Sequence, residues 1–183
     1  MASTNFPQTT LLRLSPLIAS TFSLTYSICE GLHYSTFVSP PVKPHSRTLL
    51  PPFWRTLLPR ALPIVIGGYS SAALFAGLNL YLHSPLLSQS RLIGGLSAKG
   101  WFVTGLVASL GHFCFVPAVA WKLEAIMKAD EKGDVEEGGE KSGRSDPVQT
   151  MEKWLDVHWI RLAVVDVPGW VAVCLGTVLG LGV

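Results

Sequence analysis

The chain has 183 residues, of which 49% are hydrophobic and 14% are charged, and its formal net charge is +2. Ordinary soluble domains carry about 25% charged residues, so this composition excludes that class and indicates a membrane protein with a single domain over residues 1–183. No basic stripe interleaved with aromatic residues points to a nucleic-acid partner.

A first membrane span is predicted at about 11–38, although serine and threonine weaken its hydropathy. A cleaved signal peptide is the alternative, but no small-x-small cleavage motif follows the apolar stretch. Five polar residues fall within about a quarter of the helix circumference, so this stripe is expected to face protein rather than lipid. They are Ser20, Ser23, Ser27, Glu30 and Tyr34.

The next two spans are predicted at about 61–82 and 100–121. Residues 39–60 contain five prolines before Pro59 and are predicted to form a loop. The second span is rich in glycine, alanine and serine at the spacing that lets helices approach closely. In the third span, Pro117 removes a backbone donor and is expected to loosen the helix close to His112.

Residues 130–146 are mostly charged or glycine and are predicted to be disordered. A helix should restart at Asp146 and Pro147, which form an N-cap and a first-turn proline, and lead into a fourth span at about 159–181. The predicted fold is therefore all-α, a four-helix transmembrane bundle.

Lysine and arginine predict the orientation of this bundle. The loops before the second and fourth spans hold ten of them, against three in the N-terminal tail, the middle loop and the C-terminus together. By the positive-inside rule both larger loops face the cytosol and both termini lie on the far side, in the endoplasmic reticulum or another internal membrane.

This topology brings several ionisable groups towards the cytosolic half of the bundle. Glu30 and His33 end the first span, while His158, Arg161 and Asp166 begin the fourth. His112 is expected roughly 13 Å deeper, so these groups could line one cavity. Simpler alternatives are a structural Glu30–Arg161 ion pair, a His112 satisfied by Ser109, and interfacial anchoring by Trp154 and His33.

Two kinds of chemistry suit such a cavity. Two or three histidines with a carboxylate could bind iron, copper or zinc, and the candidate ligands are Glu30, His33, His112 and His158. Alternatively, a histidine or carboxylate acts as general base and Arg161 stabilises the anion, which needs no cofactor. The chain has no H-E-x-x-H motif, so the base is favoured over the metal. The three cysteines form no C-x-x-C motif and are predicted to be small core residues: Cys29, Cys114 and Cys174.

Four short helices, a polar loop before the last one, and the pattern Trp154-x-x-x-His158-x-x-Arg161 resemble the DUF1772 family of small integral membrane proteins. That family includes fungal anthrone oxygenases, in which asparagine usually stands at the position of His158. The resemblance implies oxidation of an anthrone-like methylene to a ketone by dioxygen, without flavin or haem, on a flat lipophilic aromatic substrate.

The resemblance also implies roles for individual residues. His112 or His158 would be the base, Arg161 the oxyanion partner, and Glu30 and Asp166 the groups that orient them. The expected substrate contacts are Trp154, His33, Tyr34 and Ser109. The rival interpretation is a non-enzymatic membrane scaffold or transport accessory. Because the chain has no internal repeat, transport would require a homo-oligomer.

Overall fold

The structure is a computed structural model and describes residues 6–130 and 146–182. Nearly all of these residues are helical, and no β-strand occurs among them, so the all-α prediction is confirmed. The elements in chain order are α1 (Phe6–Ser35), the 3-10 turn η1 (Thr36–Val38), α2 (Lys43–Ser88), α3 (Ala98–Gly111), the 3-10 turn η2 (His112–Phe115), α4 (Val116–Met127), α5 (Pro147–Arg161), the π-helical turn η3 (Leu162–Asp166) and α6 (Val167–Leu181).

Three helical stretches of the described chain are long and apolar enough to cross a membrane: Lys43–Ser88, Ala98–Met127 and Pro147–Leu181. Helix α1 has 30 residues but is not in this group, since its serines and threonines lower its hydropathy. The predicted first span therefore stays a prediction. The polar stripe of α1 is buried at Ser20, Ser23 and Ser27, as expected of a face that packs against protein.

The described residues form two compact units, and each is described by itself. The first comprises α1 up to Ser27, then Val65–Cys114, and the chain from Arg161 onward. The second comprises Ile28–Ile64 and Phe115–Ile160.

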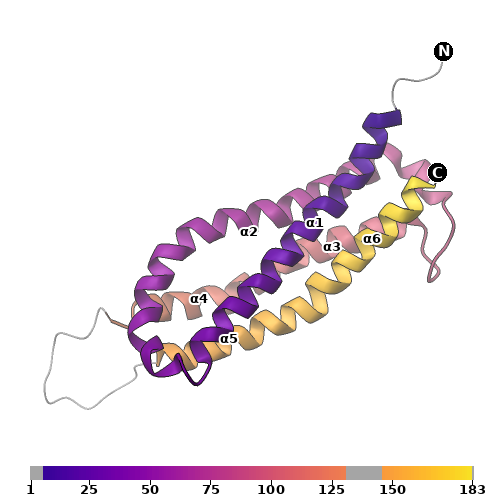
Figure 1. The fold of residues 1–183 in the computed structure, drawn as a ribbon. Coiled ribbons are helices and arrows are strands. Elements are labelled where there is room, and N and C mark those ends of the chain that lie inside the picture. The colour runs from indigo at the N-terminus through magenta and orange to yellow at the C-terminus, as the bar shows by residue number, and fades with distance from the viewer. Residues whose placement is uncertain (1–5, 131–145, 183) are drawn as a thin grey trace, which may run out of the picture. The chain divides into compact units, whose positions relative to one another are not determined.

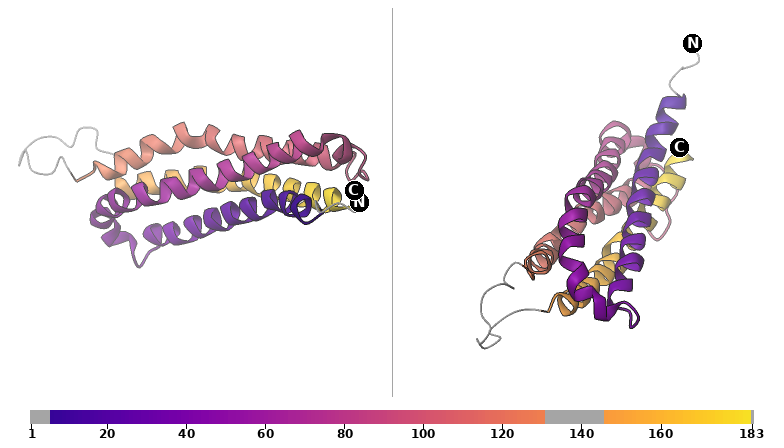
Figure 2. Two further views of the ribbon diagram at one scale, coloured as in Figure 1. Left: turned by 90° about the horizontal axis from the view of Figure 1, so that it is seen from above. Right: turned by 60° about the vertical axis from the view of Figure 1, so that its left-hand side comes forward.

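In the first unit α3 and α6 run side by side (Figures 1 and 2). A Cβ atom on Gly105 would lie 2.5 Å from Cγ2 of Val173, and one on Gly169 would lie 2.6 Å from Cβ of Ala108. Both glycines therefore allow a backbone approach that any larger residue would prevent. Gly169, Ala172, Gly176 and Gly180 are all buried, so α6 packs through a face of small residues.

The second unit packs around aromatic and aliphatic side chains from the end of α1, the start of α2, α4 and α5. Its core residues are Tyr34, Leu50, Trp54, Leu123, Ile126, Val148, Met151, Trp154 and Leu155. In this core Tyr34 lies edge-on to Trp54, with ring centroids 4.9 Å apart. Packing in this core also explains why the prediction of a loop over residues 39–60 was wrong.

The proline-rich segment predicted as a loop is helical from Lys43 onward, because α2 continues without a break to Ser88. An interior proline costs a helix about 3 kcal/mol. Leu50 and Trp54 on this part of α2 are 0% and 2% exposed, so their burial in the core offsets that cost. Tertiary packing therefore overrides the proline signal.

The remaining local predictions had mixed outcomes. The Asp146 carboxylate accepts a hydrogen bond from the Val148 N–H at 3.0 Å, which confirms the helix cap. The predicted disordered segment, residues 130–146, lies outside the described residues except for its two end residues. Cys29 and Cys114 are exposed rather than small core residues, so that prediction was wrong for both.

Candidate active site

Two interruptions of regular helix lie opposite each other in the first unit. The 3-10 turn η2 begins at His112 and leads into α4, which has Pro117 in its first turn. The π-helical turn η3 ends at Asp166, immediately before α6 with Pro168 in its first turn. A proline lacks the N–H donor and crowds the carbonyl four residues before it, so the preceding turn is rewound in both places. Single π-turns of this kind are frequent at functional sites.

The π-helical turn changes which side chains meet. On an α-helix, residues five apart point about 140° away from each other. Arg161 and Asp166 are five apart, yet Nε of Arg161 lies 3.3 Å from Oδ2 of Asp166. The wider turn therefore places the guanidinium and the carboxylate on one side of the chain.

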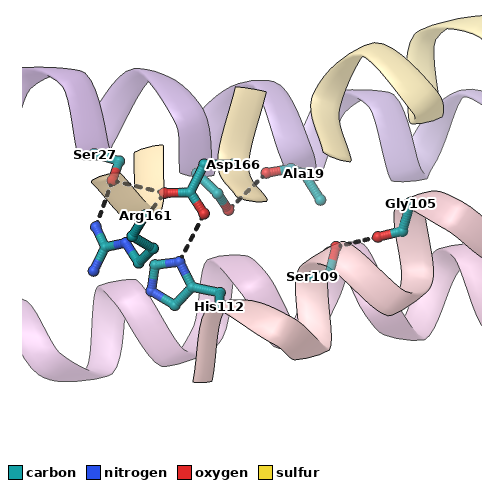
Figure 3. Close-up of polar contacts among 8 residues, drawn as sticks. Ala19, Ser27, Gly105, Ser109, His112, Arg161 and Asp166 are labelled. Carbon is teal, nitrogen blue, oxygen red and sulfur yellow. Dashed lines mark hydrogen bonds and ion pairs between the residues drawn. The ribbon is translucent and has the colours of Figure 1, made fainter. Parts of the chain in front are cut away.

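Asp166 is the centre of a buried polar network (Figure 3). Its Oδ1 atom lies 2.9 Å from Nδ1 of His112. Its Oδ2 atom accepts a hydrogen bond from the Ser27 hydroxyl at 3.3 Å as well as the one from Arg161. Nη2 of Arg161 also donates to Oγ of Ser27 at 2.8 Å. All four side chains are buried, with exposed fractions between 1% and 6%.

The partners of Asp166 fix the protonation pattern of the network. A carboxylate only accepts hydrogen bonds, so Nδ1 of His112 carries the hydrogen and Nε2 is the nitrogen that exchanges a proton. The Arg161 guanidinium compensates the charge of the buried carboxylate. The network thus combines a histidine oriented by a carboxylate with a fixed cation, which is an arrangement that suits proton transfer beside a developing anion.

Tyr69 of α2 adds an aromatic wall that the sequence did not predict. Its ring stacks on the imidazole of His112, with centroids 3.5 Å apart and an angle of 25° between the planes. Its hydroxyl is buried and makes no hydrogen bond that meets the usual distance and angle limits within the described chain. A hydroxyl-bearing aromatic residue within the small-residue stretch of the second span was the signal that could have found it.

A small cavity lies next to this network, entirely within the first unit. Its volume is about 10 Å³. The residues that line it are Ser20, Leu24, Tyr69, Ala72, Ala108, Ser109, Val165, Asp166, Gly169 and Trp170. Such a volume is close to the lower limit for one water-sized molecule.

The structure brings together three of the predicted catalytic residues, His112, Arg161 and Asp166. Ser109, predicted to contact substrate, lines the cavity but donates its hydroxyl hydrogen to the carbonyl of Gly105 at 2.9 Å rather than to His112. Ser27 completes the network, and the sequence had indicated it only as part of the polar stripe of α1.

The other predicted site residues belong to the second unit. His158 is 0% exposed and stacks on Trp154, with ring centroids 4.9 Å apart. Trp154 in turn contacts Tyr34 edge-on at 5.6 Å. These three residues form part of the core there, while Glu30 is half-buried and His33 is exposed. The predicted Glu30–Arg161 ion pair joins residues of the two units and stays a prediction.

No group of three or more histidine, cysteine, aspartate or glutamate side chains gathers closely enough to hold a metal ion in residues 6–130 and 146–182.

Comparison with known proteins finds similar proteins from fungi. No protein-family model matches it, and no solved structure matches it significantly. The epoxidase gkaX of Penicillium citrinum is 32% identical over 161 residues, 88% of this chain and 89% of that protein. The epoxidase pydX of an Acremonium species is 29% identical over 161 residues, 88% of each chain. The probable epoxidase scpX of Mollisia scopiformis is 26% identical over 160 residues, 87% of this chain and 89% of that protein. The chain therefore belongs to the family that contains the Penicillium citrinum epoxidase.

Proposed function

We propose that this protein is a membrane-embedded oxygenase that epoxidises a carbon–carbon double bond of a small lipophilic metabolite. The buried network of His112, Asp166 and Arg161 carries the proposal, because ionisable groups inside an apolar helical unit are costly and usually functional. The names of three relatives, each an epoxidase or probable epoxidase, support the same reaction class.

The stoichiometry of this reaction defines what the protein must supply. Dioxygen provides one atom to the epoxide, and the other leaves as water. The reaction therefore needs two electrons and two protons, which an external reductant of the hydride or thiol class supplies. These two electrons reduce dioxygen to the level of peroxide. The proposal assigns no resident cofactor to the chain. His112 would move protons, and Arg161 would stabilise negative charge on oxygen.

A second candidate is oxidation of an anthrone-like methylene to a ketone, which the Trp154-x-x-x-His158-x-x-Arg161 pattern favours through its resemblance to anthrone oxygenases of the DUF1772 family. This reaction needs no reductant. Oxidation of the methylene to a ketone releases four electrons, and dioxygen accepts all four. One oxygen atom becomes the ketone oxygen and the other becomes water. Dependence on a reductant therefore separates the two candidates. The relatives' names favour epoxidation.

The proposal also places the chain across an internal membrane such as the endoplasmic reticulum, with both termini on the non-cytosolic side. Three long apolar helices support a multi-pass membrane protein, and the count of lysine and arginine in the loops supports the orientation. A membrane location is also supported by the exposed apolar side chains of the first unit, such as Leu74 at 59%, Val107 at 62% and Val178 at 65%, which would be unfavourable in water. Glycosylation acceptor sites added at either terminus should become modified if the orientation is right.

The experiment begins with the gene deleted in the source organism. If the protein is an epoxidase, the deletion strain should accumulate a compound that lacks one oxygen atom of the normal product. Purified, this compound is given to microsomes that contain the protein, with isotopically labelled dioxygen and a reductant. One labelled atom should appear in the product. A substrate that instead gains one oxygen, loses two hydrogens and needs no reductant would identify the anthrone-type reaction.

Single variants then test the site. His112→Ala, His158→Ala and Arg161→Ala are compared with His45→Ala, whose side chain is exposed in the second unit. Loss of a proton-transfer group typically costs about 10²-fold to 10⁴-fold in rate. Turnover by all three site variants at the wild-type rate would exclude the proposed machinery and leave the scaffold interpretation.

A further inference from the structure

A hollow with a volume of about 440 Å³ lies at the surface of the second unit, between the starts of α2 and α5. This volume falls within the range of about 300–1,000 Å³ that is typical of small-molecule sites. The residues that line the hollow are Pro40, Lys43, Pro44, Arg47, Asp146 and Val148. None of them belongs to the network around Asp166, so the hollow is a separate feature of the molecule.

Two cationic side chains reach this hollow from one side of α2. Lys43 and Arg47 are four residues apart, which places them one helical turn from each other on the same face. Like charges at this spacing repel each other and destabilise a helix. An anion held between the two side chains would attract both of them, so the spacing favours a negatively charged occupant.

The hydrogen-bonding capacity that remains in the wall is that of a donor. An ammonium group has three N–H donors and a guanidinium group has five. Within the described chain, Nζ of Lys43 donates to Oε1 of Glu152 at 2.6 Å. Nη2 of Arg47 donates to Oδ2 of Asp146 at 2.7 Å, and Oδ1 of Asp146 already accepts the Val148 N–H. Several cationic donors therefore remain available, whereas both carboxylate oxygens of Asp146 are engaged.

The two ion pairs leave these cations accessible to a ligand. The side chain of Lys43 is 50% exposed and that of Arg47 is 71% exposed. Ion pairs at such exposure contribute little to stability, so an anion with several oxygens can compete for the cations. Glu152 is not among the lining residues, so the wall itself carries two positive charges and one negative charge.

A phosphate monoester suits this combination. It carries more than one negative charge at neutral pH and presents three strong acceptor oxygens. Arginine and lysine are the side chains that bind phosphate groups most often, arginine as a fork and lysine as a point charge. We propose that the hollow binds a phosphate monoester group through Lys43 and Arg47. The group belongs either to a soluble molecule or to a phospholipid at the membrane surface. This binding does not depend on the proposed epoxidation.

The test titrates the full chain in a non-ionic detergent with inorganic phosphate. Sodium chloride keeps the ionic strength constant, and isothermal titration calorimetry should record saturable binding. Arg47→Gln should weaken this binding about tenfold, as expected for the loss of a hydrogen bond from a charged group. Arg55→Gln is the matched control and should keep the wild-type affinity. Arg55 is also an exposed arginine of α2 paired with an aspartate, but it does not line the hollow.

Asp146→Asn tests the same ion pair from its other side. The amide still caps α5 but no longer competes for Arg47 with a full negative charge, so the affinity for phosphate should rise about twofold to fivefold. Both variants lose the ion pair between Arg47 and Asp146. Opposite changes in affinity therefore support the phosphate site, because damage to the fold would weaken binding in both variants.

Lipid nanodiscs identify the source of the phosphate group. Discs of phosphatidylcholine are compared with discs of equal parts phosphatidylcholine and phosphatidic acid, whose headgroup is a phosphate monoester. Discs with phosphatidylglycerol, a charged phosphate diester, control for surface charge. If a lipid is the ligand, phosphatidic acid alone should abolish the binding of inorganic phosphate, and if a soluble molecule is the ligand, binding should persist in all discs.

Two results would overturn the site. The first is an absence of saturable binding to the wild-type protein at constant ionic strength. The second is an affinity that is the same in the wild type, Arg47→Gln and Asp146→Asn.

Discussion

The Nδ1 atom of His112 lies 2.9 Å from Oδ1 of Asp166, and this contact joins the 3-10 turn after α3 to the π-helical turn before α6. Two segments that prolines have rewound are therefore held to each other by a buried pair of titratable side chains. Because Asp166 also pairs with Arg161, one buried carboxylate holds both an imidazole and a guanidinium.

The first prediction concerns the charge balance of this network. Asp166→Asn leaves the Arg161 guanidinium buried without its counter-charge, and breaking a buried pair in this way should lower the free energy of unfolding by about 3–5 kcal/mol. The double variant Asp166→Leu with Arg161→Met removes both charges. Its loss of unfolding free energy should be smaller than the sum of the losses in Asp166→Leu alone and Arg161→Met alone. Denaturant unfolding in detergent measures these values. Additive costs would show that the two side chains are not energetically coupled.

The sequence predicts much of this site but not its geometry. Pro117 indicated a break near His112, and helical periodicity placed Ser27 on a protein-facing stripe. The meeting of Arg161 with Asp166 could not be predicted, because an α-helix directs residues five apart in different directions and only the π-helical turn aligns them. Tyr69 was missed because its role depends on stacking across helices, which periodicity does not report.

The fold shows the same division between local and tertiary signals. The small residues Gly169, Ala172, Gly176 and Gly180 recur at helical spacing and share one buried face of α6. The proline-rich start of α2 was assigned to a loop because local propensity opposes a helix there. Its helical form depends on the burial of residues such as Leu50 and Trp54 in a core built by three other segments. Contacts of that kind are not encoded in any single stretch of sequence.

The second prediction concerns the close contact of α3 with α6. Gly105→Ala and Gly169→Ala each introduce a Cβ atom within 2.6 Å of a neighbouring side-chain atom, so each should destabilise the protein by about 1–3 kcal/mol. Gly67→Ala on α2 is the matched control, because a Cβ there meets nothing within 4 Å. That variant should be neutral or stabilising by up to about 1 kcal/mol through helix propensity. Equal melting temperatures for all three variants would contradict the close approach.

The third prediction concerns the start of α5. The Asp146 carboxylate accepts the Val148 N–H at 3.0 Å, so Asp146→Ala should cost about 1 kcal/mol. Asp146→Asn retains a capping oxygen and should lose much less. The readout is amide hydrogen exchange in the first turn of α5, which should speed up in the alanine variant only. Equal protection in both variants would mean that the cap contributes little to this helix.

The fourth prediction concerns the C-terminal end of α6, where a buried arginine satisfies a free carbonyl. Nη1 of Arg13 donates to the carbonyl oxygen of Gly180 at 2.5 Å, and Arg13 is 6% exposed. Hydrogen bonds from charged groups contribute about 1.5–3 kcal/mol, so Arg13→Met should destabilise the protein by that amount and increase hydrogen exchange in the last turn of α6. Arg91→Met is the control, because Arg91 is exposed on the loop after α2. Unchanged hydrogen exchange in the last turn of α6 of Arg13→Met would show that this hydrogen bond contributes little to the end of the helix.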